Sequence, residues 1–247
     1  MVLLAILFLA TAIMYSSVGL GGGSTYLALL LIWNIPYFIF PVIALSCNIT
    51  VVLGNCFNYI RAGNLNLKLL FPYLLGSIPL AYIGGSLPIK KEIFEILLFL
   101  VLLAAGTLLL INFKSYDDKV SAYKKIPVFV PILIGGLLGF ISGAVGIGGG
   151  IFLSPILFLI KAGRAKHIAT AASLFILINS FSGMVGQLTK DEVLFELQNY
   201  WYLLVAVLIG GQIGNFLNLK IFSARILALV TGFLVLFVAI RMGIRFY

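Results

Sequence analysis

Two glycine runs inside apolar segments place the strongest constraint on how this chain folds. Residues 19–23 read Gly-Leu-Gly-Gly-Gly, and residues 146–150 read Gly-Ile-Gly-Gly-Gly. Glycine costs a helix interior about 1 kcal/mol relative to alanine, so four glycines in five positions predict a break in each helix. Inside a bilayer, broken backbone is tolerated only where protein buries it or where it lines a cavity. The two runs therefore predict paired halves of one functional site.

The segments around these runs are too apolar for a soluble domain. The chain of 247 residues is 62% hydrophobic and 9% charged, and its mean hydropathy is +1.20. Several nearly uncharged stretches reach the roughly 20 residues that a helix needs to cross a bilayer. We expect an all-α, polytopic, multi-pass protein of the cell membrane. No basic region precedes the first glycine run, so the N-terminal segment is expected to stay in the fold rather than be cleaved.

The two halves of the chain are copies of one unit. An offset of 127 residues superposes the first glycine run on the second and Ser46 on Ser173, and an offset of 130 pairs Gly84 with Gly214. Internal repeats of this kind are common in transporter folds. The expected organisation is a first membrane repeat over residues 1–113, a polar linker loop over 114–125 and a second membrane repeat over 126–247.

The distribution of lysine and arginine predicts how the segments cross the membrane. If each glycine-broken segment is a re-entrant hairpin, eleven of the 16 basic residues fall on one side and five on the other. If each crosses once, the division is nine to seven. The eleven-to-five excess is a positive-inside signal, and it explains the net charge of +9 without nucleic acid as a partner. Each repeat then combines one hairpin with three transmembrane helices, an odd number of crossings, so the repeats are inverted. The smaller group is Lys90, Lys91, Lys190, Arg241 and Arg245.

A broken helix offers an anion site that needs no charged side chain. Backbone N–H groups are free where its second half begins, and the helix dipole adds partial positive charge there. Ser24 and Thr25 follow the first run, whereas Ile151 follows the second, which has lost this polar cap. Two alternatives stay open: glycines that only allow close helix packing, and polar side chains that only bond neighbouring helices. The predicted substrate-binding residues are Ser17, Gly19, Gly21, Gly22, Gly23, Ser24, Thr25, Asn48, Asn55, Gly146, Gly148, Gly149, Gly150, Ser173, Asn179 and Gln212.

Other chemistry has little support in the sequence. All seven carboxylates fall in loops or at segment ends, whereas proton-coupled carriers keep an ionisable group within the membrane. The sequence has no Gly-x-Ser-x-Gly elbow, no His-Glu-x-x-His helix and no buried aspartate pair, and the first glycine run has no lysine after it as a nucleotide-binding loop would. We therefore expect no enzyme, no catalytic residue, no metal site and no cofactor. Cys47 and Cys56 lie on opposite faces of one predicted helix, and both inert packing and a sulfur-relay role stay open for them. Tyr37 and Tyr59, near segment ends, are expected to be interfacial anchors.

The doubled glycine motif resembles the TauE/SafE family of membrane transporters. Its two forms, Val18-Gly19-Leu20-Gly21-Gly22-Gly23 and Val145-Gly146-Ile147-Gly148-Gly149-Gly150, lie in two modules separated by a loop. The stretch Ala171-Ala172-Ser173, after Gly163-Arg164-Ala165-Lys166, is similar to the second module of that family. The resemblance implies two modules of three membrane helices. It also implies transport of small sulfur-containing anions: sulfite, sulfoacetate, other sulfonates or thiosulfate.

These observations predict a secondary transporter that moves a small sulfur-containing anion through a midplane site formed by the two glycine breaks. Export is favoured, because an inside-negative potential drives anion exit by ~2.3 kcal/mol per charge per 100 mV. Uptake would need a coupling ion, and no carboxylate is placed to carry protons. An anion-selective channel, an uptake permease for a related organic anion and a non-transporting scaffold are the alternatives. The sequence does not indicate an oligomeric state.

Overall fold

The computed structural model describes residues 1–17, 19–111, 127–160, 162, 165–190, 196–217 and 224–245. All regular elements within these ranges are helices, which confirms the all-α prediction. Five of the described helices are long and apolar enough to cross a membrane. The predicted linker over residues 114–125 lies outside the described residues.

Among the described residues, each half contains five α-helices whose lengths follow a similar order, and the two halves differ in where the 3-10 helix lies. The first half contains α1 (Val2–Ser16), α2 (Gly23–Ile32), η1 (Tyr37–Ile39), α3 (Phe40–Arg61), α4 (Leu67–Ser86) and α5 (Lys91–Ile111). The second half contains α6 (Phe129–Val145), α7 (Gly150–Leu159), α8 (Ala165–Gln187), η3 (Gln198–Tyr200), α10 (Trp201–Leu217) and α11 (Ala224–Arg245).

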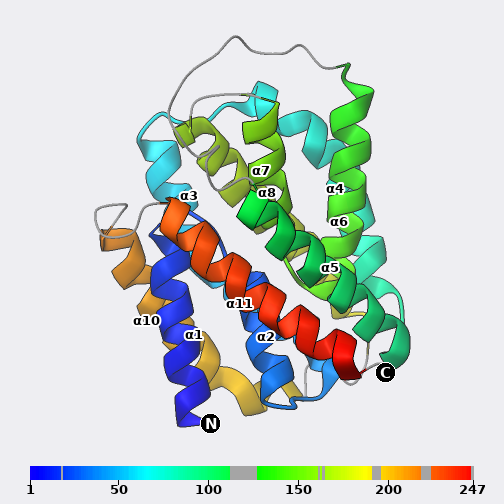
Figure 1. Ribbon diagram of the computed structural model, residues 1–247. Helices are drawn as coiled ribbons and strands as arrows, with labels where there is room; N and C mark the ends of the chain where they lie inside the picture. Colours follow the sequence, from blue (N-terminus) through cyan, green and yellow to red (C-terminus); the bar gives the residue numbers. More distant parts are fainter. Residues whose placement is uncertain are drawn as a thin grey trace.

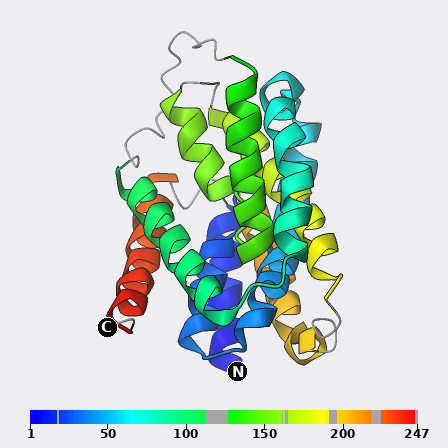
Figure 2. The ribbon, with the colours of Figure 1, turned by 90° about the vertical axis from the view of Figure 1, so that its right-hand side faces the viewer.

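Each glycine run separates two helices, as the sequence predicted. The first run lies between α1 and α2, and the second lies between α6 and α7. Left-handed backbone, which glycine adopts without steric cost, occurs at Gly19 (φ +80°) and at Gly146 (φ +91°). Figures 1 and 2 show α1 and α2 towards the end of the molecule that holds the N-terminus, with α6 and α7 towards the opposite end.

The helix that leads into the second break packs closely against a helix of the first half. Helices α6 and α4 run in parallel, with three glycines of α6 facing the backbone of α4. A Cβ atom added at Gly135 would lie 2.8 Å from the Cα of Tyr73, and one at Gly139 would lie 2.6 Å from the Cα of Ser77. Small residues let helices approach this closely in membranes, where apolar burial does not drive association.

The helix that leads into the first break has the corresponding partner in the second half. Helix α1 packs in parallel against α10, with Gly210 beside Ala12 and Gly214 beside Ser16. The hydroxyl of Ser16 donates to the carbonyl of Gly211 at 2.7 Å. The helix before each break therefore packs on a helix of the other half: α1 packs on α10, and α6 packs on α4.

Two groups of three helices result. We define the first bundle as α1, α3 and α10, and the second bundle as α4, α6 and α8; within each bundle α3 or α8 contacts the other two helices. The bundles meet where α3 packs on α8. Helices α5 and α11 pack on each other, and they cross near Gly106 and Gly232.

Candidate functional site

The two glycine breaks meet around one buried amide, that of Asn48 in α3. Asn48 has no exposed surface, and its Nδ2 donates to the carbonyl of Gly146 at 3.4 Å. A Cβ atom at Gly148 would lie 2.7 Å from this Nδ2, and one at Gly21 would lie 2.5 Å from Oδ1. Side chains at either glycine would therefore displace the amide that separates the two runs.

The runs also touch each other directly. A Cβ atom at Gly23, the first residue of α2, would lie 2.6 Å from the carbonyl oxygen of Ile147 in the second break. Ile176 of α8 covers both runs from the second bundle: its Cγ2 lies 3.2 Å from the position of a Cβ at Gly21 and 3.0 Å from one at Gly148. It also contacts Gly150. The structure thus brings two segments 127 positions apart into a single cluster.

Each break is anchored by the central helix of the opposite half. Asn48 of α3 donates to the carbonyl of Gly146, and Ser173 of α8 donates to the carbonyl of Gly19. These two carbonyls are equivalent in the repeat. The reciprocal bonds fix the first left-handed residue of each break across the interface between the bundles.

Both short helices begin at these breaks. Gly22, with φ +88°, precedes α2, and its carbonyl accepts from the N–H groups of Thr25 and Tyr26 at 3.0 Å. Gly149, with φ +73°, precedes α7, and its carbonyl accepts from the N–H groups of Phe152 and Leu153 at 3.1 Å. The earlier N–H groups of a helix have no partner inside it, so each start can donate to an anion.

The start of α2 carries three buried polar side chains. Thr25 Oγ1 and Tyr15 Oη lie 2.8 Å apart in a hydrogen bond. Ser24 Oγ and Tyr26 Oη have no hydrogen-bond partner in the described part of the chain. Tyr26 was not among the predicted site residues; its signal in the sequence was a polar atom placed three residues after a glycine break.

The start of α7 is apolar by comparison. Ile151, Phe152 and Leu153 are buried there, and a Cβ atom at Gly149 would lie 2.8 Å from the ring of Phe175. Ser154 is the nearest hydroxyl along the helix, and it is also buried. Ser24 follows the first break and Ile151 follows the second, and both side chains are buried. The first break is therefore lined by polar side chains and the second by apolar ones.

The model of the sulfite exporter TauE/SafE family matches residues 3–242, almost the whole chain. The chain belongs to this family. It is 26% identical to the probable membrane transporter protein y4hK of Sinorhizobium fredii, over 94% of each chain. It is 27% identical to the probable membrane transporter protein YunE of Bacillus subtilis, over 95% of this chain and 94% of that one. A probable membrane transporter protein of Methanocaldococcus jannaschii, MJ0441, is 29% identical over 76% of this chain and 73% of its own. No solved structure matches. The protein is thus a multi-pass membrane transporter of the TauE/SafE family.

Three further predicted residues of this TauE/SafE transporter lie near the cluster but bond elsewhere. Ser17 donates to the carbonyl of Met14 at 2.7 Å, within its own helical turn. Asn179 donates to the carbonyl of Phe175 at 2.8 Å, and its Oδ1 has no partner among the described residues. Asn55 lies two turns beyond Asn48, and its Oδ1 accepts from Ser16 at 3.4 Å.

Gln212 is not brought to the breaks of this TauE/SafE transporter. Its side chain is exposed on the outer side of α10, where it lines a groove with Thr50 and Leu53. The neighbouring Gly210, Gly211 and Gly214 are buried against α1 and α3. Because this glycine face sets the rotation of α10, the intervening glutamine points outward.

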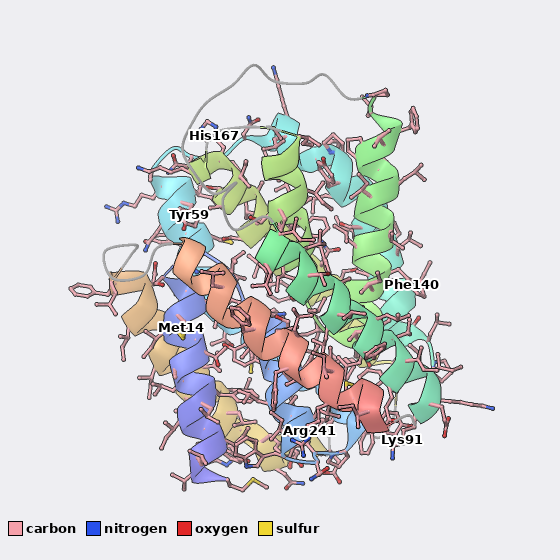
Figure 3. All side chains as sticks on the ribbon, viewed as in Figure 1. Met14, Tyr59, Lys91, Phe140, His167 and Arg241 are labelled. Carbon is pink, nitrogen blue, oxygen red and sulfur yellow. The ribbon has the colours of Figure 1, made fainter. Side chains whose placement is uncertain are left out.

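Tyr59, predicted as an interfacial anchor, also contacts the first glycine break. A Cβ atom at Gly19 would lie 2.5 Å from its hydroxyl oxygen, so the ring lies directly over the first left-handed glycine. Figure 3 shows Tyr59 on α3, above the level of Met14 of α1. In this TauE/SafE transporter Tyr59 packs on the first break, in addition to its place near the end of α3.

Proposed function

We propose that this transporter is a secondary carrier that binds a small sulfur-containing anion where the two glycine breaks meet. The observation that carries the proposal is the position of Asn48, between the starts of α2 and α7. Two helix starts and one amide supply N–H donors to an oxyanion without a cationic side chain. Glu92, Glu95 and Glu196, the described carboxylates, lie at helix ends, away from this cluster.

Unpaired hydroxyl groups support the same location. Ser24 and Tyr26, beside the first break, bury hydroxyl oxygens that have no hydrogen-bond partner in the described ranges. An unsatisfied buried polar group costs about 1–3 kcal/mol, and a bound oxyanion would accept from such hydroxyls. Ser24 and Tyr26 belong to the first turn of α2, so the first break would provide most of the side-chain donors.

The proposal includes inverted repeats with re-entrant hairpins. Exchanging equivalent helices between halves turns the α1–α10 pair into the α6–α4 pair, and it leaves the α3–α8 and α5–α11 pairs unchanged. Any two-fold axis between the halves gives this exchange; an axis in the membrane plane is supported by the position of α1 and α2 towards one end of the molecule and of α6 and α7 towards the other. In Figure 3, Lys91 and Arg241 lie at one end of the molecule and His167 lies at the other, in line with the division of basic residues.

Sulfur specificity and direction are the finer parts of the proposal. The family is described as a sulfite exporter family, which favours sulfite or a sulfonate as substrate. An inside-negative potential favours anion exit by ~2.3 kcal/mol per charge per 100 mV. A carrier without a coupling carboxylate in its centre would therefore work as an exporter.

Flux into proteoliposomes tests the carrier. We expect saturable uptake of sulfite, sulfoacetate or thiosulfate that is accelerated by the same anion on the opposite side. The Gly146→Ala variant, in which the added methyl group would clash with the backbone of Pro41 at the second break, should lose this flux. Flux that rises linearly without counterflow would identify a channel instead, and no flux of any of these anions through correctly inserted protein would contradict the function.

Cysteine labelling tests the hairpins. In a variant with Cys47 and Cys56 replaced by alanine, Val2→Cys and Pro36→Cys flank the first broken segment. A re-entrant hairpin exposes both to an impermeant thiol reagent from the same side of the membrane. Val128→Cys and Ala162→Cys, which flank the second segment, should both react from the other side. Labelling of Val2→Cys and Pro36→Cys from opposite sides would contradict the inverted arrangement.

A further inference from the structure

A pocket with two lysines opens beside the second glycine break. Its volume is about 520 Å³, and it lies between η1, the start of α3, the loop after α4 and the end of α8. Lys90 and Lys190 line it from separate loops, and no carboxylate is among its described lining residues. Asp191 and Glu192, which follow Lys190 in the sequence, lie outside the described residues.

Two consecutive hydrogen bonds hold the ammonium group of Lys190 in place. Lys190 Nζ donates to Gln187 Oε1 at 2.9 Å, and Gln187 Nε2 donates to the carbonyl of Gly143 in α6 at 2.8 Å. Gln187 is only 1% exposed. Partial burial lowers the pKa of Lys190 from its usual value, because desolvation disfavours the cation. An anion in the pocket would compensate this desolvated charge.

The pocket reaches the end of the helix that leads into the second break. Ala144, one residue before the end of α6, lines it, and so does Pro41. A Cβ atom at Gly146 would lie only 2.5 Å from the Cα of Pro41. Pro41 therefore separates the pocket from the first left-handed glycine of the second break.

Aromatic side chains form a further wall of the pocket. Tyr37 and Phe94 line the pocket with ring centroids 5.8 Å apart, and Phe38 lies beside them. Pockets of 300–1,000 Å³ with apolar walls and a few polar groups are typical sites for small organic ligands. A bare inorganic oxyanion would leave most of this volume unfilled.

We propose that Lys90, Lys190 and these aromatic walls form a second anion site, a vestibule next to the second break, for an organic anion with an apolar body. Its charged group would bind between the lysines, and its apolar part would pack on Tyr37 and Phe94. The vestibule would collect the anion on the side of Lys90. Its lysines would supply the donors that the apolar start of α7 does not. The inference rests on the proposed function, because the anion at this site is one on its way to or from the breaks.

Two charged thiol reagents measure the potential in this vestibule without any transport. The reporter is Ile89→Cys, a lining position, in a variant with Cys47 and Cys56 replaced by alanine. The probes are methanethiosulfonate ethylsulfonate, an anion, and its trimethylammonium counterpart, a cation. Lys190→Met should slow the anionic reagent and speed the cationic one by about threefold each, as expected for one unit charge several ångströms away in water. The ratio of the two rates then changes about tenfold.

Lys91→Met is the matched control. Lys91 is adjacent to Lys90 in sequence, but its side chain is 57% exposed and lies 3.9 Å from Glu95, and it does not line the pocket. We expect it to change the ratio by less than twofold. Millimolar benzenesulfonate should protect Ile89→Cys from both reagents, whereas benzyltrimethylammonium should not.

Equal effects of Lys190→Met and Lys91→Met, or equal protection by the two organic ions, would overturn the vestibule. Pro88→Cys, a second lining position, serves as reporter if Ile89→Cys does not insert. Protection by benzenesulfonate in a protein that shows no anion flux would instead count against the proposed function and leave the vestibule in place.

Discussion

The two glycine breaks are alike at their first and fourth positions, where the glycine is left-handed in both, but they differ in their surroundings. Gly19 and Gly146 are both left-handed, and each carbonyl accepts a hydrogen bond from the opposite half. Hydroxyl groups of Ser24, Thr25 and Tyr26 follow the first break, whereas isoleucine and phenylalanine follow the second. The second break instead lies beside a pocket with two lysines. The two breaks therefore have left-handed glycines at equivalent positions, whereas the polar side chains beside them differ.

The largest expected effect is at the second break. Gly146→Ala would force a side chain at φ +91° against the backbone of Pro41, which cannot move aside as a side chain could. A displacement of about 1 Å can cost roughly 100-fold in rate, so we expect at least that loss of initial flux. Gly63→Ala is the matched control, because it has φ +72° with nothing within 4 Å of the added Cβ. Similar losses in both variants would attribute the effect to backbone strain alone.

Asn48→Asp should have the next largest effect, because it places a negative charge between both breaks at constant volume. We expect the KM for a sulfur oxyanion to rise about 10- to 100-fold, a change of about 1.4–2.8 kcal/mol in binding. Asn58→Asp, on an exposed position of the same helix, should change KM by less than threefold. Equal KM values for the two variants would remove Asn48 from the site.

The first break should be more forgiving than the second. The atoms nearest to an added Cβ at Gly19 belong to the side chain of Tyr59, which can be truncated. Gly19→Ala should lower flux about 10-fold, and the double variant with Tyr59→Ala should recover most of the loss in a double-mutant cycle. Additive losses would show that the ring is not what limits this position. No such rescue is available at Gly146, where backbone blocks the added atom.

The smallest expected effect separates the polar linings. Ser24→Ala removes an unpaired hydroxyl at the start of α2, and a hydrogen bond contributes about 0.5–1.5 kcal/mol. We expect KM to rise about 3- to 10-fold. Ser154→Ala, a buried serine of α7, should leave KM unchanged within twofold. A larger rise in KM for Ser154→Ala than for Ser24→Ala would instead assign the polar half of the site to the start of α7.

Sequence reasoning was most successful where backbone chemistry decides the structure. Three consecutive glycines strongly disfavour a helix, so both breaks could be predicted from residues alone, whereas pairs such as Gly210-Gly211 stay within a helix. Helix rotation was less accessible, because lipid and protein core are both apolar and a membrane helix has no strong amphipathic signal. This is why Gln212 was expected at the site although the glycine face of α10 turns it outward. The vestibule depends on two loops that meet only in the folded chain, so the pairing of Lys90 with Lys190 could not be inferred from their positions.

The packing of α1 on α10 and of α6 on α4 also has a consequence for biosynthesis. Ser16 of α1 bonds to the carbonyl of Gly211, 195 positions later in the chain. At an elongation rate of about 5–20 residues per second, α1 waits roughly 10–40 s for the helix that holds it, whereas α6 finds α4 already made. The amino-terminal broken helix therefore stays without this partner until α10 emerges, and the first break is completed last although it is synthesised first.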